Sequence, residues 1–279
     1  MDIYKFFDKN KNYTKLEERI IDYFYDNIDS IFFMTIGEIS KDLNISQATI
    51  SRFVRHAGYS NFKSLKNAIL SNLGKKTPGE KIRVSIDKNI DDPISSFYLY
   101  QQNCINKTFD MLDLNVIDNI SQSIIDSKNI FLYGKGAAKS LCDLLKFRLK
   151  RFGKNVIIMN SSGSEMFEDL INIRKDDLVI IFSFENLSKE VEVILSYAKK
   201  VYFKTAIFTR RKHDKLLDCV DFVVNVYRGQ PNEYHSMAAP VILLDSLVIL
   251  TAYKMGEDVI NKLEELHCLK DYYIDKIPR

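Results

Sequence analysis

One stretch of the chain carries only positive charge and holds side chains suited to recognising another molecule. Residues 43–79 contain no aspartate or glutamate but six lysines and arginines, although the whole chain is nearly balanced, with 40 basic and 37 acidic residues. Arginine pairs with guanine edges, glutamine with adenine, and serine or threonine with phosphate or base. Lysines hold phosphates, which adds affinity without sequence choice. The predicted nucleic-acid contacts are Ser46, Gln47, Ala48, Thr49, Ser51, Arg52, Arg55, His56, Lys63 and Lys66.

Start and stop signals place these side chains on short helices. Thr14-Lys15-Leu16-Glu17 and Thr35-Ile36-Gly37-Glu38 are capping boxes, which mark helix starts. Asn44 suits the tight turn after the second helix, because asparagine tolerates left-handed geometry. Ser46 caps a third helix that Gly58 ends, and a fourth is predicted over about residues 61–73. Helix, turn and helix is a DNA-binding arrangement, and we prefer it to a generic helical bundle with a basic surface.

Apolar residues recur at helical spacing and predict the buried faces. For the first helix these residues are Leu16, Ile20, Ile21, Phe24 and Tyr25. For the two helices around the turn they are Ile36, Ile39, Leu43, Ile45, Ile50, Phe53 and Val54. After a breaker-rich junction around Pro78, a bridging helix over about residues 94–112 is predicted to pack through Tyr98, Ile105, Phe109 and Leu112.

Beyond residue 113, strand-like and helix-like segments alternate. Buried strands are predicted at residues 130–133, 156–159, 178–182, 204–208 and 222–224, and helices near 137–152, 164–173, 187–199 and 237–254. Such alternation implies a parallel sheet with helices on both faces. The predicted fold class is α + α/β: an all-helical helix-turn-helix domain (1–76), a linker and bridging helix (77–112), and a doubly wound parallel five-stranded sheet domain (113–279).

Two loops follow the first and third predicted strands, at the edge where ligands bind in such sheets. Gly134-Lys135-Gly136 follows the first strand and opens a helix, and the run from Ser183 to Glu190 follows the third. A dinucleotide motif would need a third glycine where Lys139 stands. We therefore expect no NAD and no other cofactor.

The N-terminal residues resemble RpiR/MurR-type bacterial transcription regulators. The matching runs are Thr35–Ser40, Ile45–Phe53, Gly58–Tyr59 and Phe62–Lys66, and their spacing needs no gaps. Residues from about 113 to 255 look like the SIS (sugar isomerase) domain that such regulators carry. In that domain, loops of pattern G-x-G-x-S and S-x-S-G-x-T cradle a sugar phosphate. We expect a homodimer or tetramer that binds a pseudo-palindromic operator and senses a sugar-derived metabolite.

Some residues keep that loop pattern and others depart from it. Gly134, Gly136, Ser183 and Ser188 keep it, whereas alanine stands at 138, glutamate at 185 and asparagine at 186. A carboxylate pointing into the site would repel a phosphate, since like charges at ~4 Å cost on the order of 4 kcal/mol at an intermediate dielectric. Either a nearby lysine (135, 139 or 189) offsets this charge, or the carboxylate faces solvent. The hypothesis is an altered site for an unusual sugar phosphate, an uncharged or amino sugar, or no ligand.

An enzyme is the alternative function. Catalytic SIS domains move a proton between sugar carbons with a glutamate or histidine base, and Glu233 and His235 are candidates. We expect them to be ligand contacts or structural residues, and the changed loops favour a regulator over a phosphosugar isomerase with an accessory helical domain. The predicted effector contacts are Gly134, Lys135, Gly136, Ala138, Ser183, Glu185, Asn186, Ser188, Glu233 and His235.

Composition indicates the compartment. Cys104, Cys142, Cys219 and Cys268 are far apart and form no C-x-x-C pair, which argues against zinc and disulfides and fits a reducing cytoplasm. No apolar run approaches the ~18 residues needed to cross a bilayer, and the charged N-terminus lacks the apolar core of a signal peptide. We predict a cytoplasmic protein with no metal site and no membrane contact.

Overall fold

The computed structural model describes residues 6–7, 11–27, 34–72, 77–87, 92–185, 187–211, 214–230 and 232–277. The chain divides into two compact units. The first unit comprises Met1–Leu99, Arg211–Asp214 and Gly229–His235. The second comprises Tyr100–Arg210, Lys215–Arg228 and Ser236–Arg279. The predicted three-part division at residues 76 and 112 stays a prediction.

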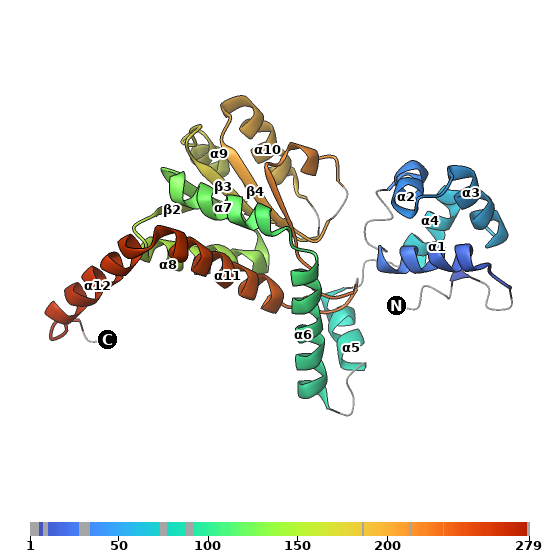
Figure 1. Ribbon diagram of the computed structural model, residues 1–279, viewed down its shortest axis with the longest axis horizontal. Helices are drawn as coiled ribbons and strands as arrows, with labels where there is room; N and C mark the ends of the chain where they lie inside the picture. The colour runs from blue at the N-terminus through green and yellow to red at the C-terminus, as the bar shows by residue number, and fades with distance from the viewer. Residues whose placement is uncertain are drawn as a thin grey trace. The chain divides into compact units, whose positions relative to one another are not determined.

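The N-terminal part of the first unit is helical, as the capping signals predict. It contains α1 (Lys15–Asp26), α2 (Ile36–Leu43), α3 (Gln47–His56) and α4 (Phe62–Asn72), coloured blue to cyan in Figure 1. Helix α5 (Pro78–Asp87) follows and was not predicted. Its start is set by Thr77, whose backbone N–H donates to Glu80 at 2.6 Å.

Side-chain caps fix where these helices begin and turn. Thr14 and Glu17 form the predicted reciprocal capping box at α1, and Thr35 and Glu38 form the second at α2. Asn44 adopts φ 53° and ψ 48°, which confirms the left-handed turn after α2. The starts of α1 and α2 and the turn after α2 therefore follow from local sequence chemistry, without any long-range packing.

A single apolar cluster joins α1 to α4. Ile20, Ile21 and Phe24 of α1 are fully buried in it. Of the predicted core residues around the turn, Ile39, Leu43, Ile50, Phe53 and Val54 are buried, whereas Ile36 and Ile45 are only partly buried against the cluster. Leu16 and Tyr25, also predicted to be buried, are instead partly exposed. They lie at the two margins of the α1 stripe, in its first turn and near its end, where fewer partners cover a side chain.

Five parallel strands form the sheet of the second unit. They are β1 (Asn129–Gly134), β2 (Asn155–Ile158), β3 (Leu178–Phe182), β4 (Lys204–Thr209) and β5 (Phe222–Asn225), in the order β2-β1-β3-β4-β5. All five match the predicted strands. The order reverses at β1, whose neighbours are β2 on one side and β3 on the other, so the β1/β3 boundary is the switch point where ligands bind in open α/β sheets.

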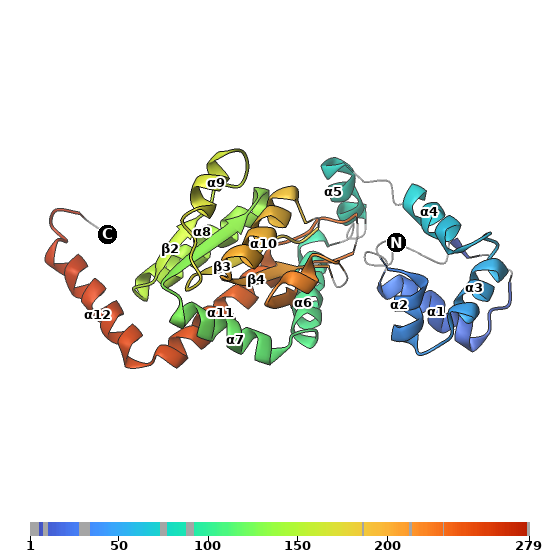
Figure 2. The ribbon, with the colours of Figure 1, turned by 90° about the horizontal axis from the view of Figure 1, so that it is seen from above.

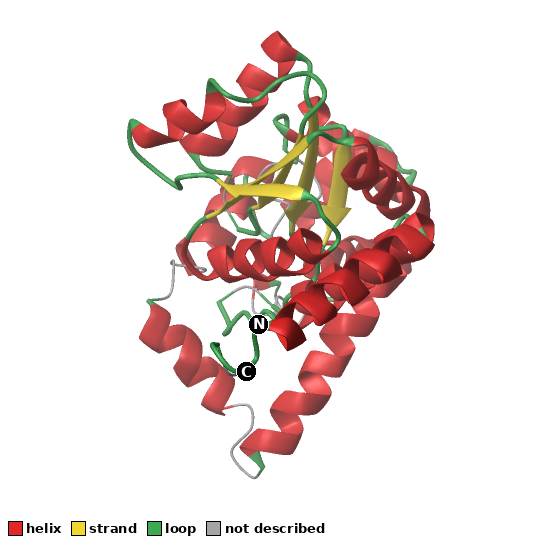
Figure 3. Cartoon of the chain, turned by 90° about the vertical axis from the view of Figure 1, so that its left-hand side faces the viewer, coloured by secondary structure: helices red, strands yellow, loops and turns green. Residues whose placement is uncertain are grey.

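Helices cover both faces of this sheet, which confirms the doubly wound prediction (Figure 3). One face packs against α7 (Leu114–Asp126), α8 (Lys139–Arg151) and α11 (Ala238–Met255). The other packs against α9 (Glu165–Leu170) and α10 (Lys189–Val201). Alternate residues of each strand point to opposite faces, so Ile130 and Leu132 join the first cluster while their neighbour Phe131 joins the second.

Two further helices differ from expectation. Helix α6 (Pro93–Asp110) is the predicted bridging helix, but Tyr98 and Phe109 of its apolar stripe are each 64% exposed. Helix α12 (Glu257–Tyr272) was not predicted, because its polar composition resembles a tail; its only buried residue is Val259. Figures 1 and 2 show α12 projecting beyond the sheet.

Among the helices that the structure describes, α11 is long and apolar enough to cross a membrane by length and composition, with a mean hydropathy of 1.6. This differs from the expectation that no apolar run approaches the ~18 residues needed to cross a bilayer. Leu243, Leu244 and Leu247 of α11 are buried in the cluster shared with α7 and α8. That packing is typical of a core helix.

Candidate functional site

The first candidate site is the outer face of α3. Ser46 caps the helix by accepting from the Thr49 N–H at 3.1 Å, and its hydroxyl lies 2.8 Å from that of Thr49. Ile50, Phe53 and Val54 are buried beneath the helix, as the periodicity predicts. Seven predicted contacts are exposed: Ser46, Gln47, Ala48, Arg52, Arg55 and His56 at α3, and Lys63 on α4.

The turn before α3 brings the start of that helix close to the start of α2. Ile45 donates its N–H to Ser40 at 2.9 Å, which closes the turn. A β-carbon added at Gly37 would lie 3.2 Å from Nε2 of Gln47, so the Gln47 side chain lies over the first turn of α2. This closeness of Gln47 to α2 was not predicted, because the two residues belong to different helices.

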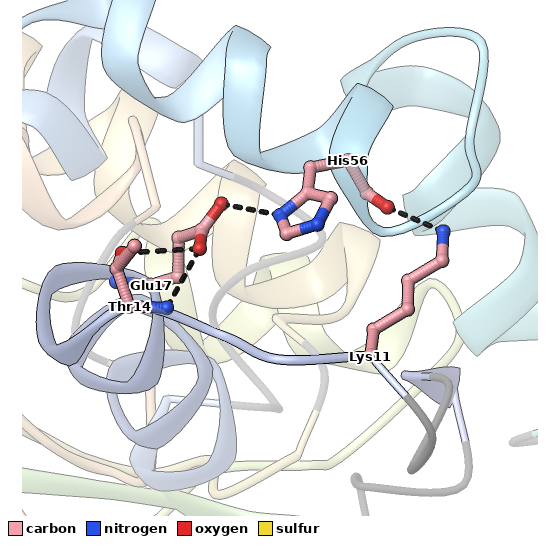
Figure 4. Close-up of polar contacts among 4 residues, drawn as sticks. All are labelled: Lys11, Thr14, Glu17 and His56. Atoms are coloured by element: carbon pink, nitrogen blue, oxygen red, sulfur yellow. Dashed lines mark hydrogen bonds and ion pairs between the residues drawn. The ribbon is translucent and has the colours of Figure 1, made fainter.

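Two predicted DNA contacts are engaged within the domain. Lys66 is half-buried and donates from Nζ to the Met34 carbonyl at 3.1 Å; burial lowers the pKa of Lys66. His56 places Nδ1 2.7 Å from Oε1 of Glu17 (Figure 4). Lys66 and His56 are therefore already held by partners within the domain. Lys63 on α4 is exposed.

The second candidate site lies at the carboxyl edge of β1 and β3. Gly134 pairs in register with Phe182, so the loop after β1 and the loop after β3 begin side by side. A β-carbon at Gly134 would lie 2.8 Å from the Ala138 carbonyl oxygen and 3.0 Å from Sγ of Cys142, so only glycine lets α8 pack this closely. Gly136 needs glycine for another reason, its positive φ of 61°.

Tyr133 and Ser188 link the two loops. The hydroxyl groups of these residues lie 3.4 Å apart, and the Tyr133 hydroxyl also donates to the Ser161 carbonyl at 3.3 Å. Burial raises the pKa of Tyr133. Ser188 caps α10 by accepting from the Val191 N–H at 3.5 Å. The sequence reading missed Tyr133, because a tyrosine inside a buried strand reads as core.

The charged groups at this edge occur in opposite pairs. Lys135 lies 3.3 Å from Glu190, and the Ser188 hydroxyl, the Glu190 backbone N–H and Lys135 lower the pKa of Glu190. Glu185 lies 3.8 Å from Nη1 of Arg210, a side chain that is 10% exposed against 43% for Glu185. The cation beside Glu185 is therefore an arginine after β4, where the sequence reading proposed a lysine.

The remaining effector predictions fall outside this cluster. Ala138 is buried at the start of α8, and Asn186 lies outside the described residues. Glu233 and His235 belong to the first unit, where Glu233 is buried and the His235 ring lies 2.9 Å from the Gln230 carbonyl. Their part in effector binding stays a prediction.

Two family models match the chain. The model described as "Helix-turn-helix domain, rpiR family" matches residues 5–76, and the model "SIS domain" matches residues 123–250. An uncharacterized HTH-type transcriptional regulator in the aarA 3′ region of Providencia stuartii is 24% identical over 255 residues, covering 89% of this chain and 90% of that protein. These matches confirm the resemblance and support a transcription regulator rather than an enzyme.

Solved structures share the fold. The Vibrio vulnificus NanR protein complexed with ManNAc-6P has a TM-score of 0.58 and 19% identity, covering 99% of each chain. The sugar isomerase domain of the RpiR transcription factor from Sphaerobacter thermophilus has a TM-score of 0.57 and 19% identity, covering 63% of this chain and 97% of that one. The five-stranded α/β unit is thus a SIS-like domain.

Proposed function

Because the chain belongs to the rpiR family of helix-turn-helix regulators that carry a SIS domain, we propose that it binds specific operator DNA through α3 and controls genes of sugar metabolism. The outer face of α3 carries this proposal. Gln47, Arg52 and Arg55 are exposed there above a buried face of Ile50 and Phe53. Long donors at the start and middle of a helix can reach base edges in the major groove.

Mutation of the central arginine tests DNA binding. Arg52→Ala is expected to lower affinity for the operator about 10- to 100-fold, since a bidentate arginine–guanine contact contributes ~1–3 kcal/mol. Fluorescence anisotropy with DNA from upstream of the gene measures it, against a scrambled fragment. Arg151→Ala on α8 removes the same charge from the second unit and serves as the matched control. Equal affinity of wild type and Arg52→Ala would contradict the assignment of α3.

The regulator acts as a homodimer or tetramer on a pseudo-palindromic operator. A single reading helix covers few base pairs, and two-fold repeats of the half-site multiply the contact. Helix α12 supports self-association: it buries Val259 and leaves Ile260, Leu269 and Tyr272 exposed. An isolated helix of this length is marginal in water, so contact with a second copy would stabilise it. Light scattering of the full chain measures the oligomeric state, and a monomer would exclude this arrangement.

The SIS domain senses a sugar-derived metabolite at the carboxyl edge of β1 and β3. NanR, which shares the fold, was solved with ManNAc-6P bound, and this supports a sugar phosphate or a related molecule as effector. The effector acts by binding one arrangement of the two DNA-binding domains more tightly than another, because only differential affinity shifts such an equilibrium.

The charge pairs at this edge favour an altered phosphate site. Lys135 and Glu190, and Arg210 and Glu185, contribute two positive and two negative charges. A phosphate entering between the loops meets cations that carboxylates already compensate, and Glu185 would repel it. Hydroxyl donors and the N-terminal backbone N–H groups of α10 remain as phosphate ligands. An effector with fewer negative charges, or with an amino group near Glu185, suits this edge better.

Calorimetric titration distinguishes the ligand classes. The panel contains hexose phosphates, amino-sugar phosphates and the same sugars without phosphate. The expected order is tighter binding of amino sugars or amino-sugar phosphates than of simple hexose phosphates. Ordinary micromolar binding of common hexose phosphates would contradict the altered site. If no compound of the panel releases or absorbs heat, the proposed sensing role is contradicted, while the proposed DNA binding is unaffected.

A further inference from the structure

The far end of α3 is held by residues that precede and open α1. Lys11 donates from Nζ to the main-chain carbonyl of His56 at 2.6 Å, and the Tyr13 ring lies 5.5 Å from the His56 ring. Glu17 contacts the His56 imidazole at 2.7 Å (Figure 4). We call these four residues, Lys11, Tyr13, Glu17 and His56, the clasp. The exposed side chains proposed to contact DNA run from Gln47 to Arg55, whereas the clasp holds the last residue of α3.

Glu17 joins two structural elements with its two carboxylate oxygens. Oε2 accepts the Thr14 N–H at 2.9 Å and completes the capping box of α1, while Oε1 contacts Nδ1 of His56. Burial acts to raise the pKa of Glu17, but the bonds from Thr14 and the contact with His56 outweigh it, and the pKa is lowered. The lowered pKa favours the carboxylate form of Glu17, and this one side chain connects the start of α1 to the end of α3.

We infer that His56 is a positioning residue for the DNA-reading helix, held by Glu17, and not a base contact. The inference rests on the proposed DNA binding by α3. A contact at 2.7 Å needs a proton on Nδ1, which the neutral Nδ1–H tautomer and the imidazolium both supply. The imidazolium adds charge attraction to the carboxylate and a favourable interaction with the C-terminal end of the helix.

The clasp therefore couples operator affinity to the contact between Glu17 and His56. Glu17 of α1 holds the ring of His56, and Lys11 of the preceding segment holds its main-chain carbonyl. Loss of either side chain of the Glu17–His56 pair releases the end of α3 and should weaken operator binding.

A double-mutant cycle on the full-length protein tests this role. Operator affinity is measured for wild type, Glu17→Gln, His56→Ala and the double variant. Glutamine also completes a capping box, so Glu17→Gln removes the charge and keeps the α1 start. Each single change is expected to weaken binding about 3- to 10-fold, with no further loss in the double variant, because coupled neighbours are not additive.

Controls separate positioning from simple structure. Glu38→Gln makes the same change in the matching capping box of α2 and should keep wild-type affinity. His56→Gln retains a donor amide for the Glu17 carboxylate and should recover most of the affinity that His56→Ala loses. Circular dichroism checks that each variant is helical.

Additive losses in the cycle, or His56→Gln that binds as weakly as His56→Ala, would overturn the inference and return His56 to the DNA contacts. Wild-type protein that binds no upstream fragment would overturn the proposed function, and this inference with it. The first result leaves DNA binding standing and the second does not, so the two failures are distinguishable.

Discussion

The two candidate sites use the same device, a glycine next to a helix start, in different ways. At Gly134 an added β-carbon would meet backbone atoms of Ala138, whereas at Gly37 it would meet the end of the Gln47 side chain. The sheet edge is therefore rigidly packed, and its chemistry changes only through side chains such as Glu185. At Gly37 of α2 the neighbour is the flexible end of the Gln47 side chain of α3. The specificity proposed for α3 therefore depends on how such side chains are held.

The largest expected effect is at the rigid site. Gly134→Ala places a β-carbon 2.8 Å from the Ala138 oxygen, so the helix start must move, and overpacking of this kind costs ~1–3 kcal/mol. Thermal unfolding of the second unit should shift down. Gly79→Ala, where nothing lies within 4 Å, is the matched control and should not destabilise. An unchanged unfolding temperature for Gly134→Ala would show that the junction between β1 and α8 can rearrange to accommodate the β-carbon.

The turn in the first unit should show a smaller effect. Asn44→Ala forces alanine into the left-handed region at φ 53°, which costs ~1–2 kcal/mol. Asn44→Gly should keep stability close to wild type, because glycine adopts that region without steric cost. Urea unfolding followed by circular dichroism measures both. Equal loss in the two variants would assign the role of Asn44 to its side chain and not to its backbone geometry.

Local signals predicted the first unit better than the second. Capping boxes, Asn44 and Ser46 act within a few residues of themselves, so α1–α4 and the turn could be placed from the sequence. The five strands were also found, because buried parallel strands are continuous apolar runs. Helices α5, α7 and α12 were missed. Local caps do mark the starts of α5 and α7, at Thr77 and Asp113, whereas α12 begins without a side-chain cap and buries only Val259.

The site residues divide along the same line. Sequence reasoning found which side chains α3 exposes, because that follows from helical periodicity. It could not find that Glu17 holds His56, that Met34 holds Lys66, or that Arg210 lies beside Glu185, because each pair joins distant segments. The opposing charges at the sheet edge therefore became visible only in three dimensions.

Changing Glu185 sharpens the contrast between a retained DNA motif and an altered effector edge. Glu185→Ser replaces the carboxylate with the family's hydroxyl and leaves Arg210 nearby to attract a phosphate. Affinity for hexose phosphates, measured by calorimetry, should rise about tenfold, ~1.4 kcal/mol. Glu192→Ser removes the same charge beside Lys189 and should change affinity far less. Equal gains in affinity in both variants would mean that only the net charge matters, and not the position of Glu185.

The smallest expected change in stability, and the most specific in function, is at Gly37. Gly37→Ala meets Nε2 of Gln47 at 3.2 Å, the far end of a side chain that can rotate away. Alanine also favours a helix over glycine by up to ~1 kcal/mol, so α2 should keep or gain stability while Gln47 is displaced. Operator binding should then lose discrimination at the base pair that Gln47 is proposed to contact, with non-specific affinity unchanged. Competition with single-base operator variants measures this loss.

Gln47→Ala should lose discrimination at the same base pair. Loss at a different base pair, or none, would mean that the contact with Gly37 does not set how Gln47 is presented to DNA.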